Sequence, residues 1–223
     1  MSFLLPKAGS ECLTLGIMGG TFDPIHLGHL VTAEEARQQF KLDHVIFMPS
    51  GFPPHKDQRS LTAKEHRYLM TMLAVVDNPY FTVSRLEIER DEPSYTIHTV
   101  RRFYDLYRHN LKLYFITGAD AIFGITTWKD HGELLETCSF IAASRPGYSF
   151  NKLRSILGQE FQNVMKRIHL LEIPAMAISS TYIRQRVAQG RTIKYLTPEP
   201  VEQYIYKNHL YIPEKENSVK DGA

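Results

Sequence analysis

Two histidines three residues apart close a glycine-rich stretch near the start of the chain. A short apolar run is followed by Gly19-Gly20-Thr21-Phe22-Asp23-Pro24-Ile25-His26-Leu27-Gly28-His29, and an amphipathic run comes next. The pair Gly19 and Gly20 lets the backbone approach a ligand closely, because no Cβ intervenes. At a helix start, His26 and His29 can face the same place, and the free N–H groups there favour an anion. The whole string predicts a polyphosphate site, whereas a glycine pair alone would indicate a turn with surface or capping histidines.

A second string that suits phosphate lies near the other end of the chain, at Ile178-Ser179-Ser180-Thr181-Tyr182-Ile183-Arg184. Ser179 or Ser180 is a natural N-cap whose hydroxyl could bind backbone or phosphate. Arg184 falls about one helical turn beyond Ser180 on the same face, and its guanidinium could hold phosphate oxygens. By itself this string indicates a well-capped amphipathic helix with a surface arginine. Its pairing with the histidine string favours a phosphate site.

Several common enzyme signatures are absent from the sequence. No G-x-G-x-x-G follows the first apolar run, which disfavours a dinucleotide redox enzyme, and no P-loop string G-x-x-x-x-G-K-[ST] occurs. The hydrolase and zinc-protease strings G-x-S-x-G and H-E-x-x-H are missing too. The two cysteines, Cys12 and Cys138, are too few for a disulfide framework or a Cys-rich zinc site, so we expect a reducing compartment. A net charge of +2 is less than a dedicated nucleic-acid binder usually concentrates.

Short apolar runs alternate with longer amphipathic runs along the chain. This alternation predicts an α/β fold, a Rossmann-like doubly wound, mostly parallel sheet with helices on both faces. In such a sheet, ligands collect outside the carboxyl ends of the strands, where the histidine string lies. Strands are expected at 13–18, 44–48, 81–84, 111–117, 140–143 and 168–171. Helices are expected at 28–40, 62–76, 95–107, 129–137, 151–166, 180–189 and 200–206, the second opened by a capping box at Thr62-Ala63-Lys64-Glu65.

The chain of 223 residues is long enough for one domain with a sizeable core. We expect a single domain over residues 13–212, an N-terminal extension over 1–12 and a flexible polar tail over 213–223. No apolar run approaches the roughly 18 residues that span a bilayer. The apolar start is broken at Pro6, too early for a signal peptide. The prediction is a cytoplasmic protein with neither a membrane nor a nucleic-acid partner.

Together, H-x-G-H near the N-terminus and I-S-S-T-x-x-R much later resemble the signature of the nucleotidyltransferase superfamily with the HIGH motif. Within it, residues 13–212 resemble the bacterial nicotinate-nucleotide adenylyltransferases. Further strings of that pattern are Pro53-Pro54-His55-Lys56, Pro93-Ser94-Tyr95-Thr96, Gly118-Ala119-Asp120 with Trp128, and Leu196-Thr197-Pro198-Glu199-Pro200-Val201. The two phosphate motifs are specific to the superfamily, and the other matches are weaker singly but select the same member.

The resemblance implies a reaction that joins nicotinate mononucleotide to ATP, giving the deamido dinucleotide and pyrophosphate in NAD biosynthesis. The mononucleotide phosphate, already anionic, would attack the α-phosphate of ATP directly, so positioning and electrostatics would supply the catalysis. Mg²⁺ is implied, because triphosphate is normally handled as its magnesium complex. The catalytic residues carried over are His26, His29, Lys56 and Arg184. The ATP-binding residues carried over are Gly19, Gly20, Thr21, Phe22, His26, His29, Ile178, Ser179, Ser180 and Arg184.

The resemblance also implies a second pocket, for a flat pyridine ring that bears a carboxylate. Trp128, the only tryptophan, would stack on the ring. Backbone N–H groups at Tyr95 and Thr96, near a helix start, suit the carboxylate. Arg145 would pair with the mononucleotide phosphate. The substrate-binding residues carried over are His55, Tyr95, Thr96, Gly118, Asp120, Trp128 and Arg145.

Four of these residues have ordinary alternatives. A lone tryptophan such as Trp128 more often belongs to a core or an interface, and Arg145 before a proline fits a turn. Lys56 in a polar loop would usually be solvated. Asp120 fits a helix cap, and by resemblance it would approach either the metal ion or a ribose hydroxyl.

Three other functions stay open on the sequence alone. A phosphopantetheine adenylyltransferase uses similar phosphate motifs, but its chain is usually shorter, and Trp128 and the P-S-Y-T string argue against it. A nucleotide-binding regulatory module could dispense with His26, His29 or Arg184, yet all three are present. A nucleic-acid-binding protein is disfavoured because the charges are interspersed. The expected partners are therefore ATP and nicotinate mononucleotide, with a homo-oligomer left open.

Overall fold

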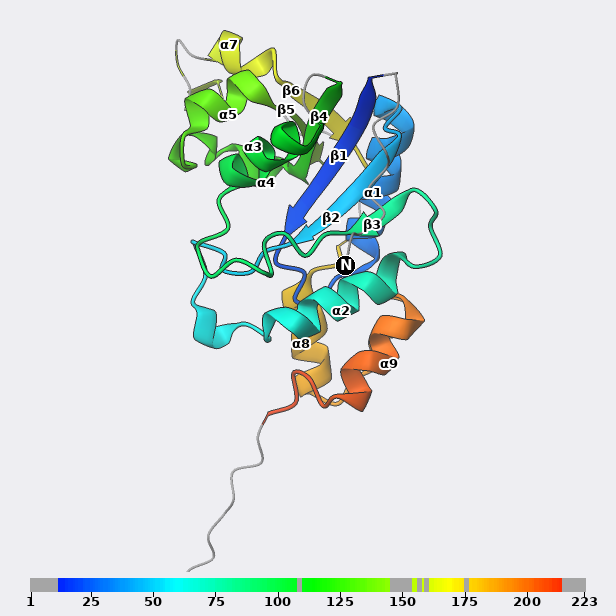
Figure 1. Ribbon diagram of the computed structural model, residues 1–223. Helices are drawn as coiled ribbons and strands as arrows, with labels where there is room; N and C mark the ends of the chain where they lie inside the picture. The colour runs from blue at the N-terminus through cyan, green and yellow to red at the C-terminus, as the bar shows by residue number, and fades with distance from the viewer. Residues whose placement is uncertain are drawn as a thin grey trace, which may run out of the picture.

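A parallel sheet of six strands forms the centre of the molecule (Figure 1). The computed structural model describes residues 12–107, 110–144, 154–155, 158, 161–174 and 177–213. Across the sheet the strand order is β3-β2-β1-β4-β5-β6, and each neighbouring pair is parallel. The strands are β1 (Leu13–Gly20), β2 (His44–Pro49), β3 (Phe81–Val83), β4 (Leu111–Gly118), β5 (Ser139–Ser144) and β6 (Ile168–Glu172). The predicted Rossmann-like doubly wound sheet is confirmed.

The order in which strands are added to the sheet reverses between β1 and β4. The chain moves outward from β1 through β2 to β3 and then crosses back to β4, which pairs with the other side of β1. In an open α/β sheet, ligands bind outside the carboxyl ends of the strands at such a reversal. Because β1 ends at Gly20, the histidine string begins at this position.

Alternating side chains on the strands feed two apolar cores. On β2, Val45 and Phe47 are buried in one core, whereas Ile46 and Met48 are buried in the other. Both faces of the sheet must therefore be covered by helices, since successive side chains point to opposite faces. Helices α1, α2, α8 and α9 supply residues to the first core, and α3, α4, α5 and α7 supply the second. The helices are α1 (Leu27–Phe40), η1 (Gln58–Ser60), α2 (Lys64–Val75), α3 (Thr96–Tyr107), α4 (Ala119–Ile122), η2 (Ile125–Thr127), α5 (His131–Thr137), α7 (Phe161–Met165), α8 (Ser180–Ala188) and α9 (Glu199–Lys207).

Three helices gather beyond the carboxyl ends of the strands. Figure 1 shows α2, α8 and α9 together past the arrowheads of β1 and β2, on the same side as the loop that leaves β1. These helices come from distant parts of the sequence. They form the base from which side chains reach the candidate site. None of the helices within the described ranges is long and apolar enough to pass through a bilayer.

The predicted strands all form, each within two residues of its expected ends. The predicted capping box is wrong. Helix α2 begins at Lys64 after Ala63 and has no side-chain cap. The N–H of Thr62 instead donates to the Asp23 carboxylate at 3.2 Å, so a tertiary contact fixes the chain entering the helix.

The remaining helices differ from prediction mainly at their ends. The helix expected over 129–137 begins at His131, and the helix expected over 151–166 is represented among the described residues by α7. The short elements α4, η1 and η2 were not predicted. Each spans about one turn or less, too short for a helical period to show in the sequence.

Candidate active site

The loop that leaves β1 carries the two histidines to the start of α1. His26 is the N-cap residue, with extended backbone, and Leu27 begins the helix. The rings of His26 and His29 stack with centroids 3.7 Å apart. Nδ1 of His29 accepts the backbone N–H of His26 at 3.2 Å. The predicted convergence of the two histidines is thus present in the structure.

Burial keeps both rings neutral. It lowers the pKa of His26 to about 4. The pKa of His29 is also lowered well below its usual value, first by burial and then by the positive charge of protonated His26 and of Lys56. Nδ1 of His26 is buried and has no hydrogen-bond partner within the described part of the chain. A neutral imidazole has one donor and one acceptor nitrogen, so each ring keeps an N–H for a ligand.

Side chains from distant elements hold the carbonyl groups of this loop. Arg67, 1% exposed, donates to Thr21 O at 2.8 Å, and Arg184 donates to Asp23 O at 2.7 Å. The hydroxyls of Ser180 and Thr197 donate to the next two carbonyls, Pro24 O and Ile25 O, at 2.8 and 2.9 Å. These carbonyls are thus held by side chains from α2, α8 and the chain before α9.

The cations of the site surround a single buried carboxylate. Lys56 lies close enough to Arg184, Asp23 and Arg67 for their charges to act on it. Partial loss of solvent, and next the charge of Arg184, lower the pKa of the Lys56 ammonium. Asp23 is 2% exposed and also acts on Arg67. This clustering of like charges is costly in the free protein and suits a polyanionic ligand.

The other residues of the two phosphate strings have mixed roles. Ser179 is the N-cap of α8, and its hydroxyl accepts the N–H of Tyr182 at 3.1 Å, as predicted. Ile178 packs against the first apolar core. A Cβ on Gly19 would come within 2.5 Å of the Phe115 ring, so glycine is required there by packing as well as by any ligand. A Cβ on Gly20 would come within 2.8 Å of the Phe22 ring.

A cavity of about 820 Å³ contains most of the predicted substrate-binding residues. Trp128 is half-buried, and its ring meets Phe115 and Phe140 edge-on with centroids 6.0 Å away in each case. The N–H of Tyr95 already donates to Pro93 O at 2.9 Å, whereas Thr96 begins α3, where N–H groups have no partner within the helix. The cavity is lined by Pro54, His55, Ser94, Tyr95, Thr96, Asp120, Ala121, Gly124, Thr127, Trp128 and Lys129.

The loop after β2 joins the two halves of the site. His55 lines the cavity, and its neighbour Lys56 faces the cation cluster. Gly118, the N-cap of α4, is not among the lining residues, and a Cβ there would meet nothing within 4 Å. Arg145 lies outside the described residues.

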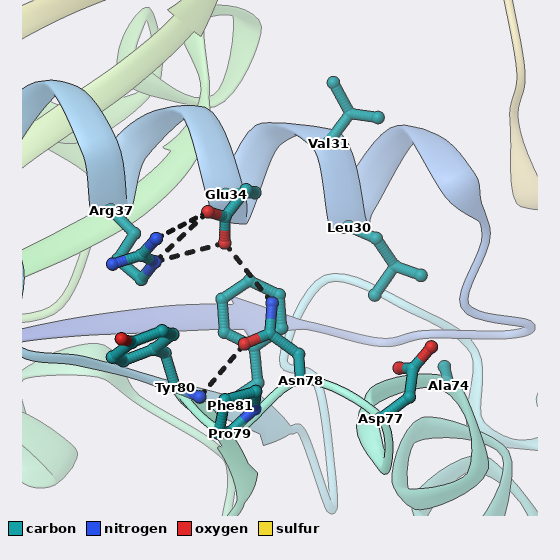
Figure 2. Close-up of a pocket in the computed structure, with 10 residues that line it drawn as sticks. All are labelled: Leu30, Val31, Glu34, Arg37, Ala74, Asp77, Asn78, Pro79, Tyr80 and Phe81. Atoms are coloured by element: carbon teal, nitrogen blue, oxygen red, sulfur yellow. Dashed lines mark hydrogen bonds and ion pairs between the residues drawn. The ribbon is translucent and has the colours of Figure 1, made fainter.

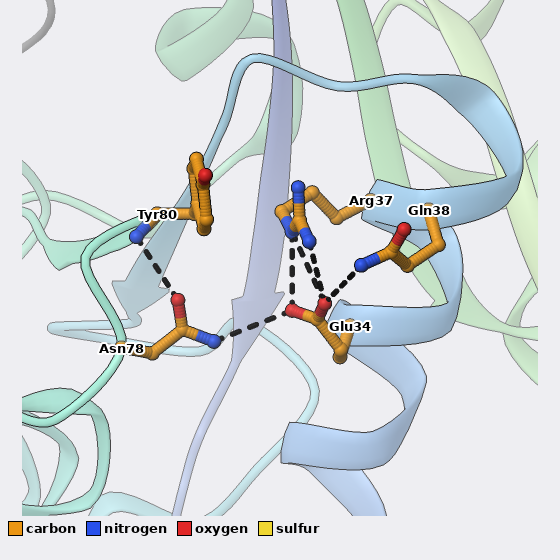
Figure 3. Close-up of polar contacts among 5 residues, drawn as sticks. All are labelled: Glu34, Arg37, Gln38, Asn78 and Tyr80. Atoms are coloured by element: carbon orange, nitrogen blue, oxygen red, sulfur yellow. Dashed lines mark hydrogen bonds and ion pairs between the residues drawn. The ribbon is translucent and has the colours of Figure 1, made fainter.

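A different cavity, of about 530 Å³, lies between α1 and the connection from α2 to β3 (Figure 2). Its main charged groups pair with one another: Arg37 donates to Glu34 at 2.7 Å, and Asn78 bridges Glu34 to the N–H of Tyr80 (Figure 3). The guanidinium of Arg37 also lies 4.1 Å from the centre of the Tyr80 ring. Hydrogen bonds from Arg37, chiefly, lower the pKa of Glu34 to about 2. This network lies at the amino end of β3 and ties α1 to the edge of the sheet, away from the carboxyl ends of the strands where ligands of such sheets bind.

One carboxylate of the large cavity fits a role as a metal ligand. Among the described residues, no three His, Cys, Asp or Glu side chains form a group that could hold a metal. The exposed carboxylate of Asp120 lines the large cavity, whereas Asp23 has both oxygens engaged by protein donors. Mg²⁺ commonly keeps several waters and takes one or two carboxylates plus substrate phosphates. Asp120 is therefore the described carboxylate that fits this role.

Comparison with known proteins agrees with the geometry. The cytidylyltransferase-like family matches residues 17–186 of the chain. A probable nicotinate-nucleotide adenylyltransferase from Thermoanaerobacter is 55% identical over 93% of this chain and 98% of its own length. The chain belongs to the nicotinate-nucleotide adenylyltransferase family. A relative of the same name from Moorella thermoacetica is also 55% identical, over 93% of this chain and 96% of its own length.

Solved structures share the fold at lower identity. Plasmodium falciparum nicotinic acid mononucleotide adenylyltransferase complexed with NaAD has a TM-score of 0.74 at 23% identity, covering 89% of this chain and 97% of that one. The same enzyme complexed with APC has a TM-score of 0.71 at 22% identity, with the same coverage. These likenesses support the Rossmann-like fold.

Sequence reasoning missed several residues that shape this family member's site. Arg67, Thr197 and Tyr211 all bond to the loop after β1, and Lys129 lines the cavity with its ammonium 4.7 Å from the centre of the Tyr95 ring. Lys129 directly follows Trp128, the residue expected to stack on the pyridine ring. Its place in the sequence could therefore have predicted a cation in the same pocket. Thr197 stands in the Leu196–Val201 string of the family pattern but was given no role, and nothing in the sequence connects Arg67 or Tyr211 to the loop.

Proposed function

We propose that this chain transfers the adenylyl group of ATP to nicotinate mononucleotide, giving the deamido dinucleotide and pyrophosphate. The observation that carries the proposal is the joining of two sites. A pair of stacked neutral histidines, His26 and His29, lies with Lys56 and Arg184 at the switch point of the sheet. The loop that holds Lys56 also borders a cavity lined by Trp128. The first site suits a triphosphate and the second suits a flat ring.

The chemical step needs no protein nucleophile. A phosphate oxygen of the mononucleotide attacks the α-phosphorus of ATP, and the bond from that phosphorus to the bridging oxygen breaks. Pyrophosphate leaves with the bonding electrons, so negative charge grows on it. Fixed N–H donors and cations that meet this charge lower the barrier.

The residues of the two phosphate strings meet that charge. His26 and His29 donate ring N–H groups to the phosphates, and Lys56 and Arg184 offset charge on the departing pyrophosphate. Gly19, Gly20, Thr21 and Phe22 line ATP with backbone, and the α8 start with Ser179 and Ser180 supports the β- and γ-phosphates. When bound, Mg²⁺ offsets further charge on the triphosphate, and Asp120 would hold it through one carboxylate.

The large cavity takes the mononucleotide. Trp128 is anchored edge-on by Phe115 and Phe140, so its position is set before a ring arrives. Two groups suit a carboxylate: the N–H of Thr96, at the start of α3, and the ammonium of Lys129, which among the described residues is the one lysine or arginine that lines the cavity. Arg145 pairs with the mononucleotide phosphate in this proposal.

The deciding experiment measures pyrophosphate release from Mg-ATP with three acceptors in parallel: nicotinate mononucleotide, nicotinamide mononucleotide and phosphopantetheine. We expect release with the first and much less with the other two. A site with a cation and N–H donors for a carboxylate leaves those donors unpaired with an amide. The His26→Ala variant serves as the control for background hydrolysis.

Each other result has a definite meaning. Release only with phosphopantetheine would retain the phosphate site and reject the pyridine pocket. Equal release with the acid and the amide would reject a carboxylate-reading role for Thr96 and Lys129. No release with any acceptor, from folded protein that binds ATP, would reject the proposed transfer.

A further inference from the structure

The carboxylate of Asp23 lies among the cations of the site yet forms no ion pair with them. Its Oδ2 accepts the N–H of Thr62 at 3.2 Å, and its Oδ1 accepts the phenol of Tyr211 at 2.7 Å. The charge of Asp23 acts on Lys56 and on Arg67. In the described ranges, however, no salt bridge within 4.0 Å involves Asp23. Each carboxylate oxygen is taken by a neutral donor instead.

Tyr211 reaches this carboxylate from beyond α9, 188 residues along the chain. Its backbone has φ 65°, in the left-handed region that residues with a side chain rarely adopt. Such a conformation persists where the surroundings determine it. Burial, and next the charge of Asp23, raise the pKa of Tyr211, so the phenol remains a hydrogen-bond donor at neutral pH. The hydroxyl lies against Met70 of α2, with oxygen and sulfur 4.0 Å apart.

We propose that Tyr211 is a positioning residue for the ATP site. By donating to Oδ1, its phenol holds the Asp23 carboxylate between Tyr211 and the N–H of Thr62. The carboxylate then forms no ion pair with Lys56 or Arg184. Both cations then stay available to phosphate oxygens. This inference rests on the proposed function and deepens its ATP site.

The physical reason is that a buried carboxylate oxygen must have a partner. Without the phenol, Oδ1 of Asp23 would be left unsatisfied in a site with little solvent. Lys56 is a cation on which the charge of Asp23 already acts, and an ion pair with Lys56 would have to break before that ammonium met a phosphate. The expected consequence is weaker ATP binding with little effect on the cavity that contains Trp128.

The test compares Tyr211→Phe with Tyr204→Phe. Tyr204 is the control, because it lies in α9, shortly before Tyr211 in the chain, and its hydroxyl makes a side-chain hydrogen bond to His66 at 2.8 Å, outside the candidate site. Calorimetry with Mg-ATP alone gives the dissociation constant without turnover, and kinetics gives the KM of each substrate. We expect about a tenfold loss of ATP affinity in Tyr211→Phe, typical of a lost hydrogen bond to a charged group. The KM of the mononucleotide should be unchanged, and Tyr204→Phe should bind ATP as the wild type does.

A second variant separates positioning from a general loss of structure. In Asp23→Asn with Tyr211→Phe, residue 23 has no charge to pair with Lys56, so ATP should bind more tightly than in Tyr211→Phe alone. Wild-type ATP affinity in Tyr211→Phe would overturn the inference. So would an equal loss for both substrates, or weaker ATP binding in the double variant. Wild-type protein that binds no Mg-ATP would instead reject the proposed function, and this inference with it.

Discussion

His26 and His29 form a stacked pair in which the backbone of one fixes the ring of the other. The ring planes are inclined by 28°, and Nδ1 of His29 accepts the N–H of His26. An imidazole that accepts at Nδ1 carries its proton at Nε2 when neutral. The neutral ring of His29 therefore has a defined tautomer, in which Nε2 carries the proton and can donate it to a ligand. Two neutral rings can lie this close because neither carries charge in the free protein.

Replacement of His26 tests whether its ring donates to the reacting phosphates. We expect His26→Asn to lower kcat by about 10²-fold or more, as loss of one transition-state donor typically does. Asparagine is chosen because it is a good N-cap residue, so the start of α1 is retained. Steady-state kinetics at saturating ATP measures the effect. His209→Asn, at an exposed position beyond α9, is the matched control.

The outcome that contradicts the role is simple. Folded His26→Asn protein with near-wild-type kcat would show that the ring is a structural cap. A fall in kcat in both variants would point to assay or folding effects instead.

The depressed pKa of His26 also makes stability depend on pH. Folded His26 has a pKa of about 4 and unfolded histidine about 6.5, so between these values the unfolded chain binds the extra proton. The contribution is present above pH 6.5 and is lost as the pH falls toward 4. Urea unfolding of wild type and His26→Asn at pH 7 and pH 5 should show the wild type losing about 2 kcal/mol more than the variant over that range. Parallel losses in the two proteins would refute a buried neutral His26.

Arg184 holds the loop after β1, and in the proposed function it also meets phosphate. Its Nη1 donates to Asp23 O at 2.7 Å and its Nη2 to the Thr181 hydroxyl at 3.4 Å, and in the proposed function the other N–H groups of the guanidinium meet phosphate. Lysine has a single nitrogen and no fork. We therefore expect Arg184→Lys to raise the KM of ATP about tenfold or more. Arg186→Lys is the control, since Arg186 lies on the same helix but donates to Thr192 O and Tyr182. Equal ATP kinetics in the two variants would overturn the assignment.

The fold could be predicted because its strands are short apolar runs separated by amphipathic ones. Burial on both faces makes β2 apolar after His44, and such a run is visible without any tertiary knowledge. The start of α2 could not be predicted in the same way. The string at Thr62 has the residues of a capping box, but the distant carboxylate of Asp23 takes the Thr62 amide.

The residues of the candidate site likewise fall into two groups, those that the sequence could reveal and those that only the folded chain reveals. Residues in contiguous strings, such as the histidine pair and the start of α8, were visible because their spacing is local. Arg67 was not, because an arginine on an amphipathic helix normally faces water, and only the folded chain shows it buried against carbonyls of the loop. Tyr211 is further still from its partner in sequence. A contact between two such residues leaves no periodic signal in a single chain.

Gly51 offers a test of how tightly the loop after β2 is held. A Cβ at Gly51 would overlap the carbonyl oxygen of Glu87, a backbone atom that cannot move alone, and Gly51 O accepts a hydrogen bond from Arg67. Gly51→Ala should therefore destabilise the protein by about 1–3 kcal/mol, the usual range for overpacking. Gly118→Ala is the matched control, because a Cβ there meets nothing within 4 Å.

Because this loop also carries Lys56, the KM of ATP should rise in Gly51→Ala as well. Urea unfolding and ATP kinetics on both variants measure the two effects. Equal stability of the two alanine variants would mean that the loop shifts freely, and Lys56 would then have no fixed position before ATP binds.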